Sequence, residues 1–153
     1  MLVRQVMSSE AQACTSQQTL GEAARIMWEL DVGCVPVVND EGQPIAMLTD
    51  RDIAMAAYTT GKPLTELHVW SAMSSGVFSC KESDTLAAAE QTMRCWQVRR
   101  VPVVDDTGCL VGIVSINDVV LARGRTQAER VKERVLGDVT ETLTAICRHR
   151  MNA

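Results

Sequence analysis

The sequence predicts an α+β fold of two β-α-β-β-α repeats, packed with pseudo-twofold symmetry and followed by a C-terminal helical tail. Two observations lead to this prediction. Residues 3–56 and 69–122 correspond at a constant offset of 66 positions without a gap, and both copies contain the sequence VPVV. Within each copy, helical and strand-like apolar patterns follow one another in the same order. We therefore expect repeats at 1–62 and 63–124 and a tail at 125–153.

The first copy shows how each element is predicted. Thr19 precedes apolar residues at helical spacing, and Thr19 with Glu22 forms a capping box. The β-branched run CVPVV then predicts a strand, and the turn NDEG places Gly42 where φ can be positive. A second strand, PIAMLT, leads into a helix that opens at TDRDIAMAA.

The second copy repeats this order with RVPVV, DDTG, LVGIVS and SINDVVLAR, although Ala88 replaces the glutamate of the capping box. One copy is too short to bury a sufficient apolar core by itself, so we expect the two copies to pack on each other. Beyond them, Thr126 and Glu129 form another capping box, and apolar residues continue to Ile146. This pattern predicts an amphipathic tail helix, bent near Gly137, that packs against the body or a partner subunit.

Composition excludes several classes of function. The formal net charge of −4 and an aromatic content of 3% argue against nucleic-acid binding. No apolar run approaches the roughly 20 residues of a membrane-spanning helix, and the N-terminus does not resemble a secretory signal. The six cysteines contain no C-x-x-C pair, so we expect reduced core cysteines in the cytoplasm and no metal site. A redox-sensing or metal role is the minor alternative.

Two hydroxyl–carboxylate pairs are the candidate chemistry. Thr49 with Asp52, and Ser115 with Asp118, each place a hydroxyl at the end of a strand and a carboxylate three residues later. Such pairs are good helix caps. A helix N-terminus with a hydroxyl is also suited to phosphate, and a nearby carboxylate can accept hydrogen bonds from a ribose diol. The residues alone support the capping interpretation and the nucleotide-binding interpretation equally.

The VPVV strand, the acidic-x-Gly turn and the segment GIVSIND at Gly112–Asp118 closely resemble the CBS domain, named for cystathionine β-synthase. The resemblance covers both copies, about four-fifths of the chain. It implies two interlocked repeats with two clefts between them, which bind adenosine nucleotides or related adenosyl ligands. It also implies homodimers, and sensors in place of catalysts.

The resemblance implies roles for matching residues. Ser115 and Thr49 would contact phosphate, and Asp118 and Asp52 would hold the ribose. In the family, the two residues directly before VPVV face the phosphates. They are Arg99 and Arg100 in the second repeat but Gly33 and Cys34 in the first, so the second-repeat cleft is the better suited to bind phosphate. Adjacent strand residues point in opposite directions, so one of these arginines would face away. The full expected ligand-binding set is Met7, Gln12, Val32, Gly33, Thr49, Arg51, Asp52, Arg99, Arg100, Ile113, Ser115 and Asp118, with the base near the first four.

Two positions in the first repeat bear on its cleft. Ala46 stands where the pattern keeps Gly112 in the second repeat, which would crowd the first cleft. Arg51 would supply the missing positive charge there, or point to solvent, or pair with Asp50. The first helices of the two repeats carry Trp28 and Trp96, which would lie in a subunit interface or in a core between the repeats.

The leading hypothesis is a stand-alone regulatory module that binds AMP, ADP or ATP and transmits the ligand state to an unknown protein partner through a homodimer. The alternative is a ligand-free interaction scaffold with the same fold. A third hypothesis, a small enzyme, ranks lower because the sequence has no nucleophile–base pairing, metal cluster or P-loop. His68 and His149 both lie outside the motifs.

Overall fold

The computed structural model describes residues 1–9, 11–125 and 142. It contains two compact units. Among the described residues, unit 1 comprises Met1–Ser9, Phe78–Asp105 and residues 111–125, and unit 2 comprises residues 11–77 and Asp106–Leu110. The expected tail helix, with its capping box at Thr126 and Glu129, lies outside the described residues.

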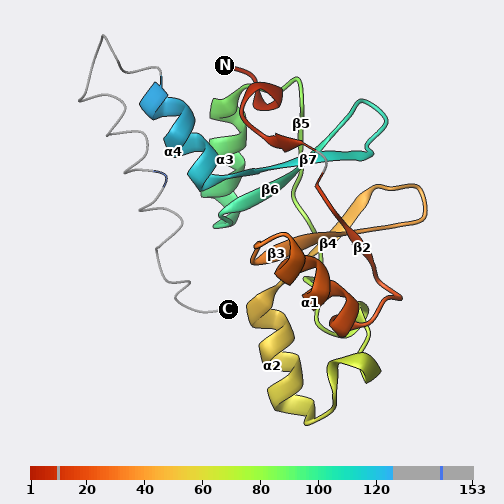
Figure 1. Ribbon diagram of the computed structural model, residues 1–153. Coiled ribbons are helices and arrows are strands. Elements are labelled where there is room, and N and C mark those ends of the chain that lie inside the picture. Colours follow the sequence, from red (N-terminus) through yellow and green to blue (C-terminus); the bar gives the residue numbers. More distant parts are fainter. Residues whose placement is uncertain (10, 126–141, 143–153) are drawn as a thin grey trace. The chain divides into compact units, whose positions relative to one another are not determined.

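Unit 2 is an α+β layer built on a three-stranded sheet of order β2-β3-β4. Strands β2 and β3 are parallel, and β3 and β4 form an antiparallel hairpin whose turn contains Gly42 at φ 77°. Helices α1 and α2 contact this sheet and each other (Figure 1). The elements are β2 (Cys14–Thr15), α1 (Leu20–Glu29), β3 (Cys34–Val38), β4 (Pro44–Thr49), α2 (Asp50–Thr60), η2 (Leu64–Glu66) and η3 (Val69–Ser71).

Unit 1 repeats the arrangement with a sheet of order β1-β7-β6-β5. Strand β5 is parallel to β6, β1 is antiparallel to β7, and helices α3 and α4 lie beside each other (Figure 1). Gly108, between β6 and β7, has φ 88°. The elements are η1 (Val3–Gln5), β1 (Ser8–Ser9), β5 (Cys80–Lys81), α3 (Leu86–Trp96), β6 (Arg100–Val104), β7 (Leu110–Ser115) and α4 (Ile116–Arg125).

Helix α1 begins and ends as local chemistry dictates. The Glu22 N–H donates to Thr19 Oγ1 at 3.2 Å, and the Thr19 N–H donates to the Glu22 carboxylate at 2.8 Å, so the predicted capping box is confirmed. At the other end Asp31 adopts φ 52°, and the Val32 N–H donates to the Met27 carbonyl at 3.0 Å. This is the Schellman pattern that ends a helix.

Each unit has its own apolar core, made largely of Val, Leu, Ile, Ala and Met. Burial of these side chains is the main favourable term in the stability of each unit. In unit 2 the buried residues are Cys14, Leu20, Ala23, Met27, Val35, Val37, Ala46, Leu48, Ile53, Leu67 and Val69. In unit 1 they are Val3, Cys80, Leu86, Ala89, Met93, Val101, Val103, Val114, Val119 and Ala122.

The opening segment of each sequence repeat contributes to the unit formed by the strands of the other repeat. In unit 1, Ser8 pairs with Ile113 of β7. In unit 2, the Ser74 N–H donates to the Met47 carbonyl at 2.9 Å, and the Met47 N–H donates to Ser74 Oγ at 2.9 Å. Sequence repeats and compact units therefore divide the chain at different places.

Candidate functional site

The hydroxyl–carboxylate pair of unit 1 closes the first turn of α4. The Ser115 N–H and the Ser115 hydroxyl both donate to Asp118 Oδ2, at 2.7 and 2.6 Å. The Asp118 N–H donates back to Ser115 Oγ at 3.3 Å. Serine fits here because its short side chain reaches the free N–H groups of the first turn.

The pair in unit 2 has the same geometry at the start of α2. The Thr49 N–H and hydroxyl donate to Asp52 Oδ2 at 2.9 and 2.6 Å, and the Asp52 N–H donates to Thr49 Oγ1 at 3.2 Å. Both pairs are therefore complete capping boxes. The capping interpretation accounts for all of these bonds.

The caps use only one of the two carboxylate oxygens at each helix start. Within the described part of the chain, every hydrogen bond to Asp118 and Asp52 goes to Oδ2. The Oδ1 atom of each carboxylate can therefore accept from a ligand diol while the cap is kept. The hydroxyl has a single hydrogen, so it could donate to a phosphate only by releasing the aspartate.

Unit 1 gathers most of the residues expected for the second-repeat cleft. The Ile116 N–H donates to the Arg99 carbonyl at 2.9 Å, which holds Arg99 beside the start of α4. Arg99 and Arg100 are exposed, and their guanidinium groups form no hydrogen bond or ion pair with the other described residues. A cation at the start of a helix that also presents free N–H groups favours an anionic ligand.

In the same unit, strand β1 brings Met7 close to β7, the strand that contains Ile113. Ser8 pairs with Ile113, and a Cβ added to Gly112 would lie 3.0 Å from Met7 Sδ and 2.7 Å from the Ser8 carbonyl oxygen. Gly112 is therefore required for the close approach of β1. Ala46, its counterpart, is fully buried in the core of unit 2.

Unit 2 brings together Gly33, Thr49 and Asp52. The charged group beside Gly33 is the carboxylate of Asp50, whereas the corresponding position of unit 1 is an arginine. The Asp50 N–H donates to the Gly33 carbonyl at 3.1 Å, and a Cβ on Gly33 would lie 3.2 Å from Asp50 Oδ2. Arg51 is exposed and forms no ion pair with another described residue, so of its three alternatives the pairing with Asp50 is absent among these residues. Gln12 is exposed before β2 and takes part in none of these contacts.

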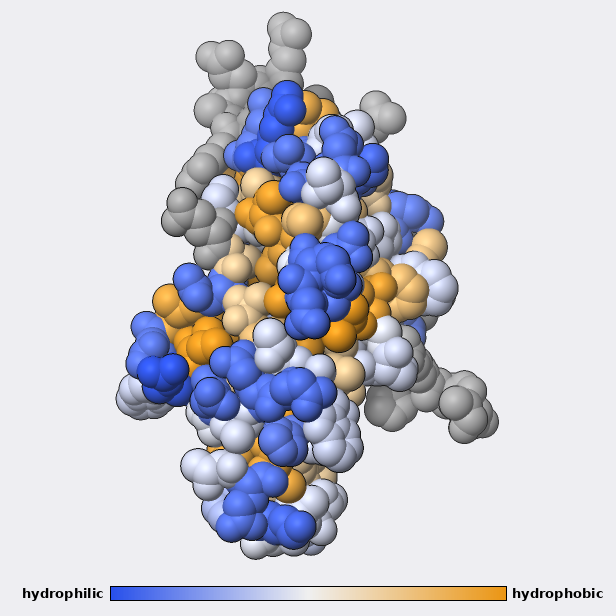
Figure 2. Space-filling view, turned by 90° about the vertical axis from the view of Figure 1, so that its right-hand side faces the viewer, coloured by the Kyte–Doolittle hydropathy of each residue, from blue (hydrophilic) through white to orange (hydrophobic). Residues whose placement is uncertain are grey.

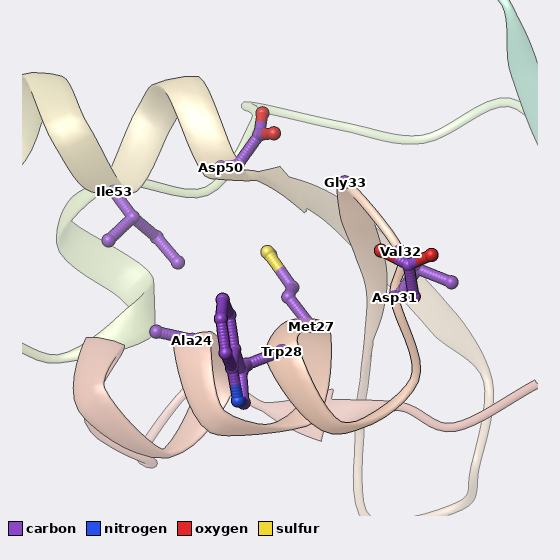
Figure 3. A pocket seen from close by; sticks show the side chains of 8 residues that line it. All are labelled: Ala24, Met27, Trp28, Asp31, Val32, Gly33, Asp50 and Ile53. Carbon is purple, nitrogen blue, oxygen red and sulfur yellow. The ribbon is translucent and has the colours of Figure 1, made fainter.

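A pocket of about 380 Å³ lies between α1 and α2 in unit 2. Figure 3 shows Ala24, Met27 and Trp28 on α1, with Asp50 and Ile53 at α2. Val32 and Gly33 were expected in a ligand site, and the other six lining residues were not. Only the two acids among them have a signal in the sequence: Asp50 stands next to Thr49 of the hydroxyl–carboxylate pair, and Asp31 follows the α1 pattern directly. The lining comprises Ala24, Met27, Trp28, Asp31, Val32, Gly33, Asp50 and Ile53.

The cysteines and histidine of the described chain give no metal centre. No group of three or more His, Cys, Asp or Glu side chains in residues 1–9, 11–125 and 142 is placed to hold a metal ion. Burial raises the pKa of the Cys14 and Cys80 thiols to about 11, so both stay protonated at neutral pH. His68 Nδ1 lies 2.9 Å from the Gln17 carbonyl oxygen, and its ring stacks on Trp70. In the same ranges, none of the helices has the length and hydrophobicity needed to cross a bilayer.

Comparison with known proteins identifies the architecture. Residues 3–58 and 68–125 each match the family model of the CBS domain. The chain belongs to the CBS-domain family. The two matches coincide with the two sequence repeats, which confirms the resemblance and the α+β fold of two CBS repeats.

Relatives of this CBS-domain protein include stand-alone chains of similar size. CBS domain-containing protein YhcV from Bacillus subtilis (strain 168) is 36% identical over 121 residues, which cover 76% of this chain and 81% of the relative. The crystal structure of Hypoxic Response Protein I with two coordinated zinc ions is 28% identical, with a TM-score of 0.71 over 79% of this chain and 98% of that chain. The CBS domain pair of protein MJ0100, in complex with 5-methylthioadenosine and S-adenosyl-L-methionine, is 25% identical, with a TM-score of 0.68 over 83% of this chain and 98% of that chain.

Proposed function

We propose that this CBS pair is a regulatory module that binds an adenosine nucleotide, AMP, ADP or ATP, at the start of α4 in unit 1. The observation that carries the proposal is the combination of a capped Asp118 with Oδ1 open to a ligand and two guanidinium groups without a described partner. The adenosyl ligands in the MJ0100 domain pair support the ligand class.

Each residue has a separate task in this proposal. Asp118 Oδ1 accepts from the ribose diol, while Oδ2 keeps the cap of α4. Arg99 binds phosphate, as does Arg100 if its side chain faces the same side, and the free N–H groups at the start of α4 add to the positive potential. Ile113 and Met7 supply apolar contact for the base. Ser115 keeps α4 capped or, after releasing Asp118, donates to phosphate.

The equivalent site in unit 2 is the weaker nucleotide site. Thr49 and Asp52 offer the same cap and the same open oxygen. Gly33 and Cys34, however, stand where unit 1 has Arg99 and Arg100, and the carboxylate of Asp50 lies against Gly33. Arg51 is the nearest source of positive charge in the sequence. Val32 and Gly33 would contact a base through their main chain, and Gln12 would join them only from its exposed position before β2.

The ligand state is passed to a protein partner through a homodimer. Trp28 is 87% exposed and Trp96 is 46% exposed on α1 and α3, which supports their use in a subunit interface. Figure 2 shows separate hydrophobic areas between hydrophilic residues on the face turned to the viewer. A ligand changes partner affinity only by binding the two states of the dimer with different affinity. The five described cysteines are not in disulfide bonds, which fits the cytoplasm.

A thermal-shift panel of AMP, ADP, ATP, NAD and S-adenosylmethionine tests the proposal, since a ligand that binds only the folded chain raises its melting temperature. Asp118→Asn is the informative variant, because the amide oxygen can keep the cap while the NH₂ group removes the open acceptor. Asp52→Asn is the matched control in unit 2. We expect a nucleotide shift in the wild type and in Asp52→Asn, and at least a roughly tenfold weaker affinity in Asp118→Asn.

The scaffold alternative is favoured by one observation, the full satisfaction of both hydroxyls by capping bonds. If it holds, no nucleotide raises the melting temperature at millimolar concentration, and Asp118→Asn changes only the stability of α4. A shift that Asp118→Asn leaves intact would place the nucleotide elsewhere in the chain.

A further inference from the structure

The sequence Met-Ser-Ser occurs near the start of both repeats, but its first serine is used differently in the two units. In unit 2 the Ser74 hydroxyl accepts from the Met47 N–H at 2.9 Å and donates to the Gly76 carbonyl at 2.7 Å. Its counterpart in unit 1, Ser8, is exposed, and the Ser8 hydroxyl forms no hydrogen bond with another residue of the described ranges. The structural role of the Ser74 hydroxyl is therefore not repeated at Ser8.

The residue that faces this serine accounts for the difference. Gly112 allows the main chain of β1 to pair with β7, with Ser8 opposite Ile113. A Cβ at Gly112 would lie 2.7 Å from the Ser8 carbonyl oxygen, and its counterpart Ala46 carries such a methyl group. In unit 2 it is accordingly the serine hydroxyl that accepts from the Met47 N–H. Main-chain pairing in unit 1 leaves the Ser8 hydroxyl available to a ligand.

The Ser8 hydroxyl lies on the face of the sheet that carries the proposed nucleotide site. Residues directly opposite each other in an antiparallel pair point to the same face, with Cβ atoms about 4.5–5.5 Å apart. Side chains two residues apart on one strand also share a face. Ser8, Ile113 and Ser115 therefore form a row on one face, while Val114 is fully buried in the core on the other. Ser115 is the end of this row at the start of α4, and Ser8 lies beside Ile113.

We propose that Ser8 is a further ligand-binding residue of the unit 1 site, and that its hydroxyl forms a hydrogen bond to the base of the nucleotide. This inference rests on the proposed function and adds base recognition by a side-chain hydroxyl to it. A hydroxyl can donate and accept, so it can bond to a ring nitrogen or to the exocyclic amino group of adenine. In unit 2 the equivalent hydroxyl of Ser74 is already bonded to main chain. The two sites therefore differ at the base as well as at the phosphate.

Calorimetric titration of adenosine and AMP into the full chain tests the proposal with Ser8→Ala. Loss of one neutral hydrogen bond should weaken the binding of both compounds by roughly threefold to tenfold. Because the base is common to both compounds, the ratio of their affinities should stay at the wild-type value. Ser8→Thr keeps the hydroxyl and suits a strand position, so it should bind both compounds as the wild type does.

Ser9→Ala is the matched control. Ser9 is the next residue of β1, is also exposed and lies opposite Gly112, so its side chain points to the other face of the sheet. Its removal should leave both affinities unchanged.

Gly112→Ala provides a second test, because the added methyl should drive the Ser8 hydroxyl into the bond that Ser74 makes in unit 2. Adenosine binding should weaken in Gly112→Ala, and adding Ser8→Ala to this variant should cause no further loss. If Ser8→Ala costs as much affinity in the Gly112→Ala variant as in the wild type, Gly112 does not control the hydroxyl and that step of the proposal is wrong.

Two results would overturn the role of Ser8 while leaving the nucleotide site in place: an unchanged adenosine affinity in Ser8→Ala, or an equal loss in Ser9→Ala. A loss for AMP without a loss for adenosine would put the hydroxyl at the phosphate and would also contradict base recognition. If the wild type binds neither adenosine nor AMP, the proposed function is wrong, and the role of Ser8 is wrong with it.

Discussion

Gly112 allows β1 to pair with β7, because any side chain at this position would meet main chain. A Cβ there would lie 2.7 Å from the Ser8 carbonyl oxygen, and a main-chain atom cannot move aside as a flexible side chain can. In unit 2, where Ala46 occupies the equivalent position, Ser74 bonds to Met47 without a strand of its own. The methyl group of Ala46 therefore coincides with the lack of a strand equivalent to β1 at Ser74.

Gly112→Ala should lower the free energy of unfolding by about 1–3 kcal/mol, because the extra methyl overpacks the β1–β7 contact. Chemical denaturation measures the change. Gly76→Ala is the control, since a Cβ at Gly76 meets nothing within 4 Å. Equal stability of Gly112→Ala and the wild type would show that β1 moves away at no cost.

The buried thiols of Cys14 and Cys80 should react slowly. Their pKa values are raised by burial to about 11, so the neutral thiol is favoured in the folded state. Because the unfolded chain releases these protons near pH 9.0 and the folded chain only near pH 11, the folded state loses stability as the pH rises between 9.0 and about 11.

At pH 8, iodoacetamide should therefore label the exposed Cys95 before Cys14 and Cys80. Mass spectrometry of the labelled peptides gives the three rates. Equal rates in the native protein would contradict the burial described for the two core thiols, and equal rates after denaturation serve as the control.

The sequence predicted individual caps well and charge environments poorly. Thr19 with Glu22 was recognised because a capping box depends only on residues within one turn. The pocket role of Asp31 and Trp28 was missed, because it depends on how α1 lies against α2. The contribution of Met7 to unit 1 was expected only from the family resemblance.

Helices and strands follow from local periodicity, and this is why their order could be predicted. The two short first strands, β2 and β5, and the two hairpins all occur where the repeated pattern places them. Helix α3 lacks the reciprocal glutamate, as Ala88 predicts, and is capped by Thr85 alone at 3.2 Å. The exchange of the opening segments between units was implied only by the family resemblance to interlocked repeats, because strand partners far apart in sequence leave no periodic signal.

The capping box of α1 should make stability depend on pH. The pKa of Glu22 is lowered from its ordinary value of 4.5, chiefly by the hydrogen bond from the Thr19 N–H and also by the Thr19 side chain. A lowered pKa in the folded state gives stability that is present above pH 4.5 and is lost as the pH falls through the folded value.

Melting curves of the wild type and Glu22→Gln at pH 7 and pH 3 measure this effect. The wild type should melt at the higher temperature at pH 7, and the difference should shrink at pH 3. Glu41→Gln, an exposed turn position, is the control for removing a charge. A difference that stays constant between the two pH values would contradict a role for the ionised carboxylate.

Taken as a whole, the molecule repeats one fold with two different charge patterns. Unit 1 places Arg99 and Arg100 near the capped start of α4, and unit 2 places Gly33 and Asp50 near the capped start of α2. We therefore propose that unit 1 recognises phosphate. This difference arises from substitutions between two copies that share nearly all of their core pattern, so the fold does not require it.

Calorimetric titration of AMP and adenosine into the wild type and into the double variant Arg99→Gln with Arg100→Gln tests this assignment most directly. We expect AMP to bind the wild type at least about tenfold more tightly than adenosine, and the variant to lose this preference while still binding adenosine. If neither compound binds at millimolar concentration, or if the variant keeps the full preference for AMP, phosphate recognition by unit 1 is wrong.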